Sequence, residues 1–282
     1  DVDNNGIAGI EKALDAQLSA GKDVTLSIDA GVQAIVTRAL RAQIDEYEAA
    51  AGAALMLEIG TGEIVSMVSL PDYNPNHIAL ADDEARFNRA SLGIYELGST
   101  FKILNTAIAL ETGTTTVDRR YSVAKPLRVP GKSITDYKTY DWPLSVPEIM
   151  VLSSNIGSAK MAAEFGGDTQ RTYLERLGMS HRLALEIPEK STPMMPAQWK
   201  AAEIATVSYG HGIAVSLPHL AAAVSAASGD GMFLEPTLLH RQPDDTRVRS
   251  RVFSETTTRA VRSMMRLVVS VSYTHLTLPT NR

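Results

Sequence analysis

Apolar residues in the first quarter of the chain form two short continuous runs, Ala53–Ile59 and Glu63–Leu70, joined by Gly60-Thr61-Gly62. Runs of that length bounded by glycine predict a hairpin of two strands at the core of a sheet. Val24–Ile28 alternates as a further short strand would. Two strands do not make a stable sheet alone, so partner strands should exist elsewhere, although none is obvious before Val269.

Helical spacing dominates the remainder of the chain. Asp29 stands in the N-cap position before apolar residues spaced i, i+3 and i+4, which predicts a helix with one buried face as far as about Ala50. Ser99–Leu110 is apolar on nearly every side and is followed by Gly113, which predicts an almost wholly buried helix. Residues 114–144 are mixed and turn-rich. Further helices are expected from the capping box Ser145-Val146-Pro147-Glu148, from Ser153-Ser154-Asn155 to Phe165, and over Thr169–Leu177, Ala197–Ser208, Pro218–Ser228 and Glu255–Val269.

Composition narrows the class of protein. The chain has 282 residues, 44% hydrophobic and 21% charged, which suits one large domain or two small ones and excludes disorder as the dominant state. Its formal net charge of −5 argues against a basic nucleic-acid-binding surface. Without cysteine there is no disulfide framework and no thiol nucleophile. The six histidines include no His-x-x-x-His pair, so no metal site is expected.

The chain contains no run of 18 apolar residues and no signal peptide, and it begins at Asp1 rather than at methionine. No membrane-spanning segment is therefore predicted within it. We expect it to be a fragment of a longer protein that carries any targeting segment upstream.

Serine followed three residues later by lysine occurs three times, starting at Ser19, Ser99 and Ser122. Gly21 interrupts the first match and Pro126 follows the third, which disfavours helical geometry at both. Only Ser99 opens an apolar helix, where one turn places Lys102 on the same face. A serine hydroxyl becomes a good nucleophile when a neighbouring base removes its proton, and a lysine that burial keeps neutral can be that base. On this pair alone, a capping serine with an exposed lysine is the more ordinary explanation.

A second motif changes that balance. Ser153-x-Asn155 is the only Ser-x-Asn in the chain, and it falls at a junction between two expected helices. The Ser153 hydroxyl could relay a proton, and the Asn155 amide could hold a substrate peptide bond. A loop serine and a capping asparagine would explain this motif in isolation. Together, the two motifs predict an active site of Ser99, Lys102, Ser153 and Asn155.

These two motifs are typical of penicillin-binding proteins and serine β-lactamases. Longer segments resemble the transpeptidase domain of class B penicillin-binding proteins, most nearly the cell-division (septal) type of proteobacteria, from about Gly9 to Val269. The resemblance is carried by Thr25–Asp29, Thr61–Val65, Pro71–Asn76, Phe87–Ala90, Tyr95–Lys102, Ser208–Ile213 and Leu217-Pro218.

The resemblance implies an α+β fold of the β-lactamase and transpeptidase type, with an antiparallel sheet flanked by helices. Residues 24–269 are then the penicillin-binding transpeptidase domain, 1–23 a linker from a missing N-terminal pedestal, and 270–282 a foreign tail. The implied activity is that of a D,D-transpeptidase on the periplasmic face of the bacterial inner membrane. Its implied ligands are peptidoglycan stem peptides ending in D-Ala-D-Ala and β-lactams, with division-complex membrane proteins as partners through the missing part, no cofactor and no nucleic acid.

The same resemblance implies a role for each site residue. Ser99 attacks the D-Ala-D-Ala bond and forms an acyl-enzyme, which an amine of a second stem peptide resolves. Lys102 is the base, Ser153 relays the proton, and Asn155 binds the donor amide.

One family motif is missing from the sequence. No Lys-Thr-Gly occurs, and the nearest string, Lys138-Thr139-Tyr140, precedes Ser153 rather than following the helix expected at Glu255–Val269. In the family that strand supplies one of two oxyanion-hole donors, and losing one costs on the order of 100–1,000-fold in rate. The C-terminal sheet strands are missing with it, so we expect an unpaired apolar edge along Ala53–Leu70. The chain as written is expected to be inactive or nearly so and prone to aggregate.

Two other functions use the same residues. A serine β-lactamase shares the nucleophile but must activate water against the acyl-enzyme. Asn155 and the long interval between the strands and Ser99 favour the transpeptidase. A β-lactam sensor or a catalytically dead division scaffold is the other alternative.

Overall fold

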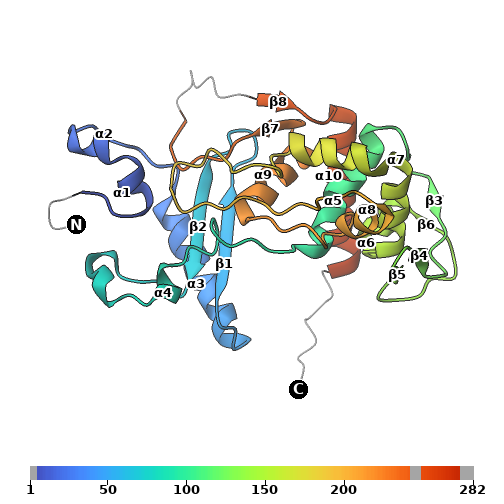
Figure 1. Ribbon diagram of the computed structural model, residues 1–282, viewed down its shortest axis with the longest axis horizontal. Coiled ribbons are helices and arrows are strands. Elements are labelled where there is room, and N and C mark those ends of the chain that lie inside the picture. The colour runs from blue at the N-terminus through green and yellow to red at the C-terminus, as the bar shows by residue number, and fades with distance from the viewer. Residues whose placement is uncertain (1–4, 242–248, 274–282) are drawn as a thin grey trace.

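The computed structural model describes residues 5–241 and 249–273 (Figure 1). Its α-helices are α1 Gly9–Ala13, α2 Asp15–Ser19, α3 Ala30–Glu46, α4 Asp83–Arg86, α5 Phe101–Glu111, α6 Val146–Val151, α7 Asn155–Arg176, α8 Ala201–Val207, α9 Leu217–Ser228 and α10 Glu255–Leu267. Short 3₁₀ turns span η1 Pro75–Leu80 and η2 Gly98–Thr100, and a π-helical turn spans η3 Val268–Tyr273. The strands are β1 Gly52–Leu57, β2 Ile64–Leu70, β3 Arg120–Tyr121, β4 Leu127–Val129, β5 Lys132–Ile134, β6 Leu144–Ser145, β7 Met232–Leu234 and β8 Arg249–Arg251.

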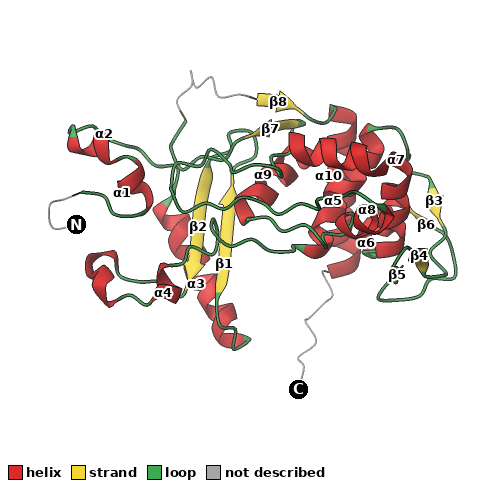
Figure 2. Ribbon diagram, in the orientation of Figure 1, coloured by secondary structure: helices red, strands yellow, loops and turns green. Residues whose placement is uncertain are grey.

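The described residues divide into a part around one hairpin and a larger helical body. Helix α3 packs on the β1–β2 hairpin. Helix α9 contacts both β1 and α5, so it lies between the hairpin and the helical body (Figure 2). All strand pairs in the described residues are antiparallel and two-stranded: β1–β2, β3–β6, β4–β5 and β7–β8. The α+β content agrees with the fold class expected from the sequence.

The predicted hairpin is confirmed. Ala53 pairs with Ser69 and Leu55 with Met67, and the register shifts between Met56 and Leu57, where β2 carries an extra residue. Side chains of β2 alternate between buried and half-buried, as expected for a strand whose one face lies on a core. The other edge of β1 has no strand partner among the described residues, which agrees with the unpaired edge expected there.

Val24–Ile28 was predicted as a strand, and that prediction is wrong. Within it only Leu26 makes a bridge, an isolated antiparallel one with Leu239. Alternation alone cannot form a strand, because the segment needs a neighbour with free backbone groups along its whole length.

The helix after Asp29 is confirmed, but its buried face is not. The Asp29 carboxylate accepts the Val32 amide at 2.9 Å, and α3 ends at Glu46 rather than near Ala50. No residue of α3 is fully buried, and Ile35 is 57% exposed. A two-stranded hairpin covers too little of a 17-residue helix to enclose a whole apolar face.

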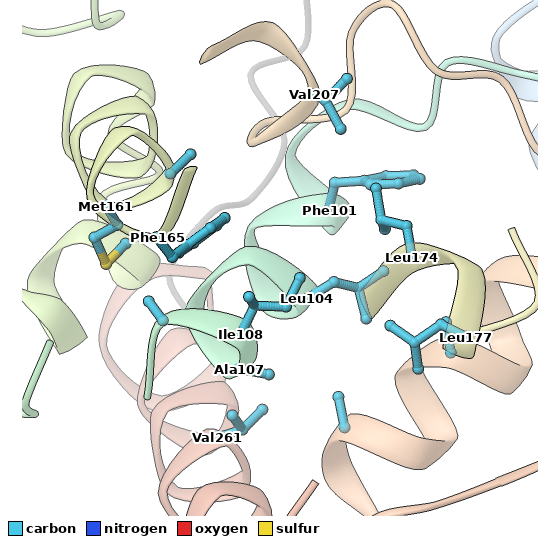
Figure 3. Packing of buried hydrophobic residues seen from close by; sticks show 14 of the residues in the cluster. Phe101, Leu104, Ala107, Ile108, Met161, Phe165, Leu174, Leu177, Val207 and Val261 are labelled. Atoms are coloured by element: carbon cyan, nitrogen blue, oxygen red, sulfur yellow. The ribbon is translucent and has the colours of Figure 1, made fainter. Parts of the chain in front are cut away.

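The main core surrounds α5. Apolar side chains from α5, α7, α8 and α10 converge on it, and Phe101 and Leu104 are each 1% exposed (Figure 3). The near-continuous apolar sequence of α5 is explained by this position, since neighbouring helices contact it on several sides. The prediction of an almost wholly buried helix is confirmed.

Two predicted helices join into one element. Residues 155–176 form α7, interrupted at Gly166, whose φ of 78° lies in the left-handed region that favours glycine. The sequence predicts that one helix ends at Phe165 and that another begins at Thr169. The break at Gly166 lies between these two positions, so the predicted interruption is confirmed. The capping box before α6 is also confirmed, with Ser145 and Glu148 each bonded to the other's backbone amide.

Residues 114–144 hold more regular structure than the sequence suggested. They include β3, β4 and β5 and the start of β6, each only two or three residues long. Helix α8 begins at Ala201, four residues later than predicted, whereas α9 and α10 agree with their predicted ranges to within two residues. The expected foreign tail falls mostly on residues 274–282, which lie outside the described residues.

Candidate active site

Ser99 and Lys102 lie at the start of α5. Ser99 is exposed in the turn η2, which Gly98 enters with a φ of 56°, and Lys102 follows one turn later. The Lys102 side chain is only 2% exposed, and its Nζ donates to Ser99 Oγ at 3.0 Å. The i, i+3 spacing therefore places a buried amine beside an accessible hydroxyl.

Ser153 completes this pair from another part of the chain. It connects α6 to α7, and its carbonyl oxygen and Oγ accept from Lys102 Nζ at 2.6 and 2.7 Å. The Ser153 hydroxyl donates to Ser99 Oγ at 2.9 Å. Each of the three side chains thus bonds to the other two, although Ser153 lies 54 positions after Ser99.

Ser153 adopts a left-handed backbone conformation with a φ of 54°. This conformation is uncommon for a residue with a side chain, and persists where surrounding bonds determine it. The turn around Ser153 is held from the preceding helix, because the Ser153 amide bonds to Met150 O at 3.3 Å and the Ser154 amide to Ile149 O at 2.9 Å.

The other two Ser-x-x-Lys matches form no such arrangement. Ser19 and Lys22 are exposed at the end of α2, and Ser122 and Lys125 are exposed after β3. In the described part of the chain, no hydrogen bond joins the side chains of either pair. Helical geometry and burial therefore distinguish Ser99 from these two serines.

Burial changes the acidity of the site lysine. Burial among apolar neighbours lowers the pKa of Lys102 from 10.5 to about 8, and the charge of Asp136 opposes that fall. Roughly one Lys102 in ten is then neutral at pH 7. The site thus holds a base that can accept a proton near neutral pH.

Asn155 is the first residue of α7 and lies outside the triangle of bonds. Its Nδ2 donates to Thr135 O at 3.1 Å, and the side chain is half-buried. The sequence predicted Asn155 beside the other three residues, and the structure places it two positions beyond Ser153 at the same helix start.

Asp136, which the sequence did not predict, also belongs to the site. Its Oδ1 accepts the Ile156 amide at 2.9 Å, and its Oδ2 accepts the Ser154 hydroxyl at 2.6 Å. No local pattern could have identified this residue, because it lies 18 positions before Ser154 in a turn-rich segment.

A third segment, residues 206–217, fixes the turn that carries Ser99. Tyr95 and Val215 exchange backbone bonds of 3.0 and 3.1 Å. The Glu96 carboxylate accepts the Gly212 amide at 2.8 Å and lies 3.3 Å from His211 Nδ1. Gly210 approaches so closely that a Cβ there would lie 2.2 Å from Gly98 O.

Between residues 5 and 273, apart from 242–248, no group of three or more His, Cys, Asp or Glu side chains could hold a metal ion. In the same residues no helix combines the length and the apolar character needed to cross a bilayer.

Chemically, the arrangement can activate a serine hydroxyl, because a base with a lowered pKa and a second hydroxyl both bond to it. A Ser-x-x-Lys nucleophile with a Ser-x-Asn partner is typical of the class formed by penicillin-binding proteins and serine β-lactamases. The chain belongs to the penicillin-binding protein transpeptidase domain family, whose model matches residues 52–280.

Named relatives agree with this family. The chain is 34% identical over 272 residues to the probable peptidoglycan D,D-transpeptidase FtsI of Caulobacter vibrioides, covering 94% of this chain and 46% of that protein. It is 29% identical over 297 residues to FtsI of Escherichia coli K12, covering 95% of this chain and 50% of the relative. The chain therefore spans about half the length of the curated relatives it matches.

Solved structures show the same fold. A crystal structure described as a peptidoglycan glycosyltransferase from Burkholderia ambifaria has a TM-score of 0.79 and 29% identity, over 87% of this chain and 74% of that one. A structure from Atopobium parvulum, described as a putative peptidoglycan glycosyltransferase, has a TM-score of 0.87 over 96% of this chain and 68% of that one. At 23% identity, the second shows the fold alone.

Proposed function

We propose that this chain is the catalytic domain of a peptidoglycan D,D-transpeptidase that cross-links stem peptides during septal cell-wall synthesis. The observation that carries the proposal is the triangle of hydrogen bonds among Ser99, Lys102 and Ser153. The transpeptidase family and the FtsI relatives support peptidoglycan as the class of substrate.

In the proposed reaction, neutral Lys102 removes the proton of Ser99 as Oγ attacks the carbonyl carbon of the penultimate D-Ala. The peptide bond to the terminal D-Ala breaks. The proton passes from Lys102 through the Ser153 hydroxyl to the departing amine, so free D-Ala leaves and an ester remains on Ser99. An amine of a second stem peptide then attacks this ester, loses a proton to the same relay and releases Ser99.

Asn155 binds the amide of the donor peptide in this scheme. One of the two Nδ2 hydrogens bonds to Thr135 O, so the side chain keeps one N–H to donate to the donor peptide and its oxygen to accept from a substrate N–H. β-Lactams are expected to acylate the same serine.

Boundaries, a location and partners can also be proposed for the domain. We propose residues 24–269 as the transpeptidase domain and 1–23 as a linker, in keeping with the absence of buried residues in α1 and α2. We also propose 270–282 as a foreign tail, a site of action at the periplasmic face of the inner membrane, and division proteins as partners through a segment upstream.

The test is covalent labelling of the 282-residue chain by penicillin, read by mass spectrometry of the digested peptides. We expect one adduct, on Ser99, that Ser99→Ala abolishes. Ser122→Ala is the matched control and should label as the unaltered chain does, since Ser122 begins a Ser-x-x-Lys match of its own. The printed sequence has no Lys-Thr-Gly, so labelling should be slow, on the order of 100–1,000-fold below an intact site.

The fate of the adduct separates the alternatives. An adduct that persists after free penicillin is removed agrees with a transpeptidase, whereas steady release of hydrolysed penicillin indicates a β-lactamase. Labelling at another residue, or equal labelling of the Ser99→Ala variant, would overturn the assignment of Ser99.

A further inference from the structure

Two residues that precede Ser153 by fewer than twenty positions hold the turn on which it lies. Thr135 O accepts from Asn155 Nδ2, and the Asp136 carboxylate accepts from the Ser154 hydroxyl and the Ile156 amide. Three consecutive residues after Ser153 are thus bonded to one dipeptide. No other carboxylate bonds to this turn in the described part of the chain.

The Asp136 carboxylate also organises the start of α7. Ser154 Oγ accepts the Gly157 amide at 2.9 Å while donating to Asp136 Oδ2. Two of the amides that a helix start leaves without intrahelical partners, those of Ile156 and Gly157, are therefore satisfied directly or through Ser154. Ser154 is fully buried, so losing its acceptor would be costly.

This anchoring acts on a strained position. Ser153 holds a φ of 54° immediately before the anchored residues, and both of its oxygen atoms bond to Lys102 Nζ. A left-handed conformation is strained for a residue with a side chain and needs fixed neighbours to persist. The bonds to Asp136 fix the residues on one side, and the end of α6 fixes the other side.

Asp136 is also a charge near the lysine. Burial lowers the pKa of Lys102 to about 8, and the negative charge of Asp136 keeps the pKa from falling further. The same charge, after burial, raises the pKa of Tyr140, so that hydroxyl stays neutral in the range where Lys102 titrates.

Several titratable groups on the elements packed around α5 are bonded to partners other than Lys102. Glu148 pairs with Arg120, Glu164 with Arg119, Lys160 with the backbone of Ser122, His219 with Ser216 and His181, Glu111 with Ser254 and Thr257, and Arg262 with the backbone of Ser228 and Gly229.

We propose that Asp136 is a positioning residue of this site: its carboxylate fixes the turn that carries Ser153 and Asn155, and it places a negative charge on the turn whose Ser153 oxygen atoms bond to Lys102 Nζ. The inference rests on the proposed function for its consequence in catalysis. It assigns to one side chain two separable effects, one of shape and one of charge.

Three variants of the 282-residue chain separate these effects. Asp136→Asn keeps the shape and can still accept the Ile156 amide, but removes the charge. Asp136→Ala removes both shape and charge. Asp141→Asn is the matched control, because Asp141 is an exposed carboxylate in the same loop.

The first measurement is the rate of Ser99 acylation by a fluorescent penicillin between pH 6 and 10. The rate should rise with pH as Lys102 loses its proton, reach half of its plateau near pH 8 and level off about one pH unit above that. In Asp136→Asn the rising limb should move to lower pH, because the ammonium loses a favourable neighbour. In Asp136→Ala the limb should move likewise and the plateau should fall at least about tenfold as the turn loosens. Asp141→Asn should change neither.

The second measurement needs no catalysis. In chains labelled with ¹⁵N-lysine, the Lys102 Nζ signal, identified by its loss in Lys102→Met, gives the lysine pKa directly by NMR titration. The pKa should fall in Asp136→Asn and stay unchanged in Asp141→Asn.

An unchanged Lys102 titration in Asp136→Asn would overturn the role of the charge. An unchanged plateau in a folded Asp136→Ala chain would overturn the role in positioning. Failure of the unaltered chain to label at Ser99 would instead count against the proposed function, and the NMR titration would still decide the role of the charge.

Discussion

Lys102 Nζ has three oxygen neighbours within hydrogen-bond distance: Ser99 Oγ, Ser153 O and Ser153 Oγ. An ammonium has three hydrogens and can donate to all of them, whereas a neutral amine has two hydrogens and a lone pair. Deprotonation therefore requires one bond to reverse. The Ser153 carbonyl cannot donate, so one of the two hydroxyls must turn toward the nitrogen. If Ser99 turns, its proton points at the amine nitrogen, as the proposed reaction requires.

Gly210 is a residue whose substitution should disturb Ser99 without touching it. Both Gly210 and Gly113 have a positive φ, 79° and 68°, but only at Gly210 would a Cβ strike a neighbour, the Gly98 backbone. Gly113→Ala should therefore cost only the conformational strain, about 1–2 kcal/mol in urea unfolding. Gly210→Ala should cost clearly more and also slow penicillin labelling of Ser99. Equal losses in the two variants, with labelling unaffected, would contradict this account.

For single residues, the sequence predicts the contacts that depend on local spacing along the chain. Ser99 and Lys102 lie one helical turn apart, and Ser153 was found because Ser-x-Asn is rare in the chain. Asp136 and the approach of Gly210 to Gly98 depend on tertiary contacts between distant segments. No period or cap in the sequence encodes such contacts.

Among the elements, α6 is short and its start is capped reciprocally. Ser145 Oγ accepts the Glu148 amide at 3.4 Å, and the Glu148 carboxylate accepts the Ser145 amide at 2.7 Å. Its six residues end two positions before Ser153, and its last carbonyls hold the Ser153 and Ser154 amides. The cap therefore stabilises the helix on which one side of the site depends.

Replacing this cap should destabilise the chain measurably. Ser145→Ala is expected to lower the free energy of unfolding by about 1 kcal/mol, whereas Ser133→Ala, at an exposed position of β5, should have little effect. The bonds from Ser145 hold the pKa of Glu148 below its usual value, so their contribution is complete above about pH 5 and is lost as pH falls through the lowered pKa. Urea unfolding at pH 7 and pH 3 measures both. A penalty that is equal at the two pH values would contradict the role of the carboxylate.

Elements with strong local signals were predicted well, and those that depend on a partner were not. The β1–β2 hairpin, the break at Gly166 and the caps of α3 and α6 each have a turn or capping residue in the sequence. Strands β3–β6 are too short to show a period. Val24–Ile28 has the alternation of a strand, but it pairs only around one isolated bridge, that of Leu26 with Leu239.

For the whole molecule, the free edge of β1 is the main liability within the described residues. Backbone groups along Gly52–Leu57 pair with β2 on one side only, and Met56 is 48% exposed. An apolar strand with an open edge offers a template for another chain. The unaltered chain is therefore expected to associate as its concentration rises.

A charge at this edge should reduce association. Met56→Lys is expected to keep the chain monomeric to a higher concentration in light scattering, because a lysine on an edge strand opposes pairing. Met194→Lys is the control for added charge alone, since Met194 is 63% exposed and bridges to Ala214 rather than to a residue of β1. Equal improvement in both variants would show that solubility, and not the strand edge, controls association.

The bonds between Glu96 and Gly212 join positions 116 residues apart. Closing so long an interval is slow and entropically costly, so contacts of this kind form late in folding. A nascent polypeptide that has emerged only as far as α7 already contains Ser99, Lys102 and Ser153. It still lacks residues 206–217, which fix the turn that carries Ser99. Covalent capture by an antibiotic should thus mark only molecules that have finished folding, and the fraction captured in a population counts them.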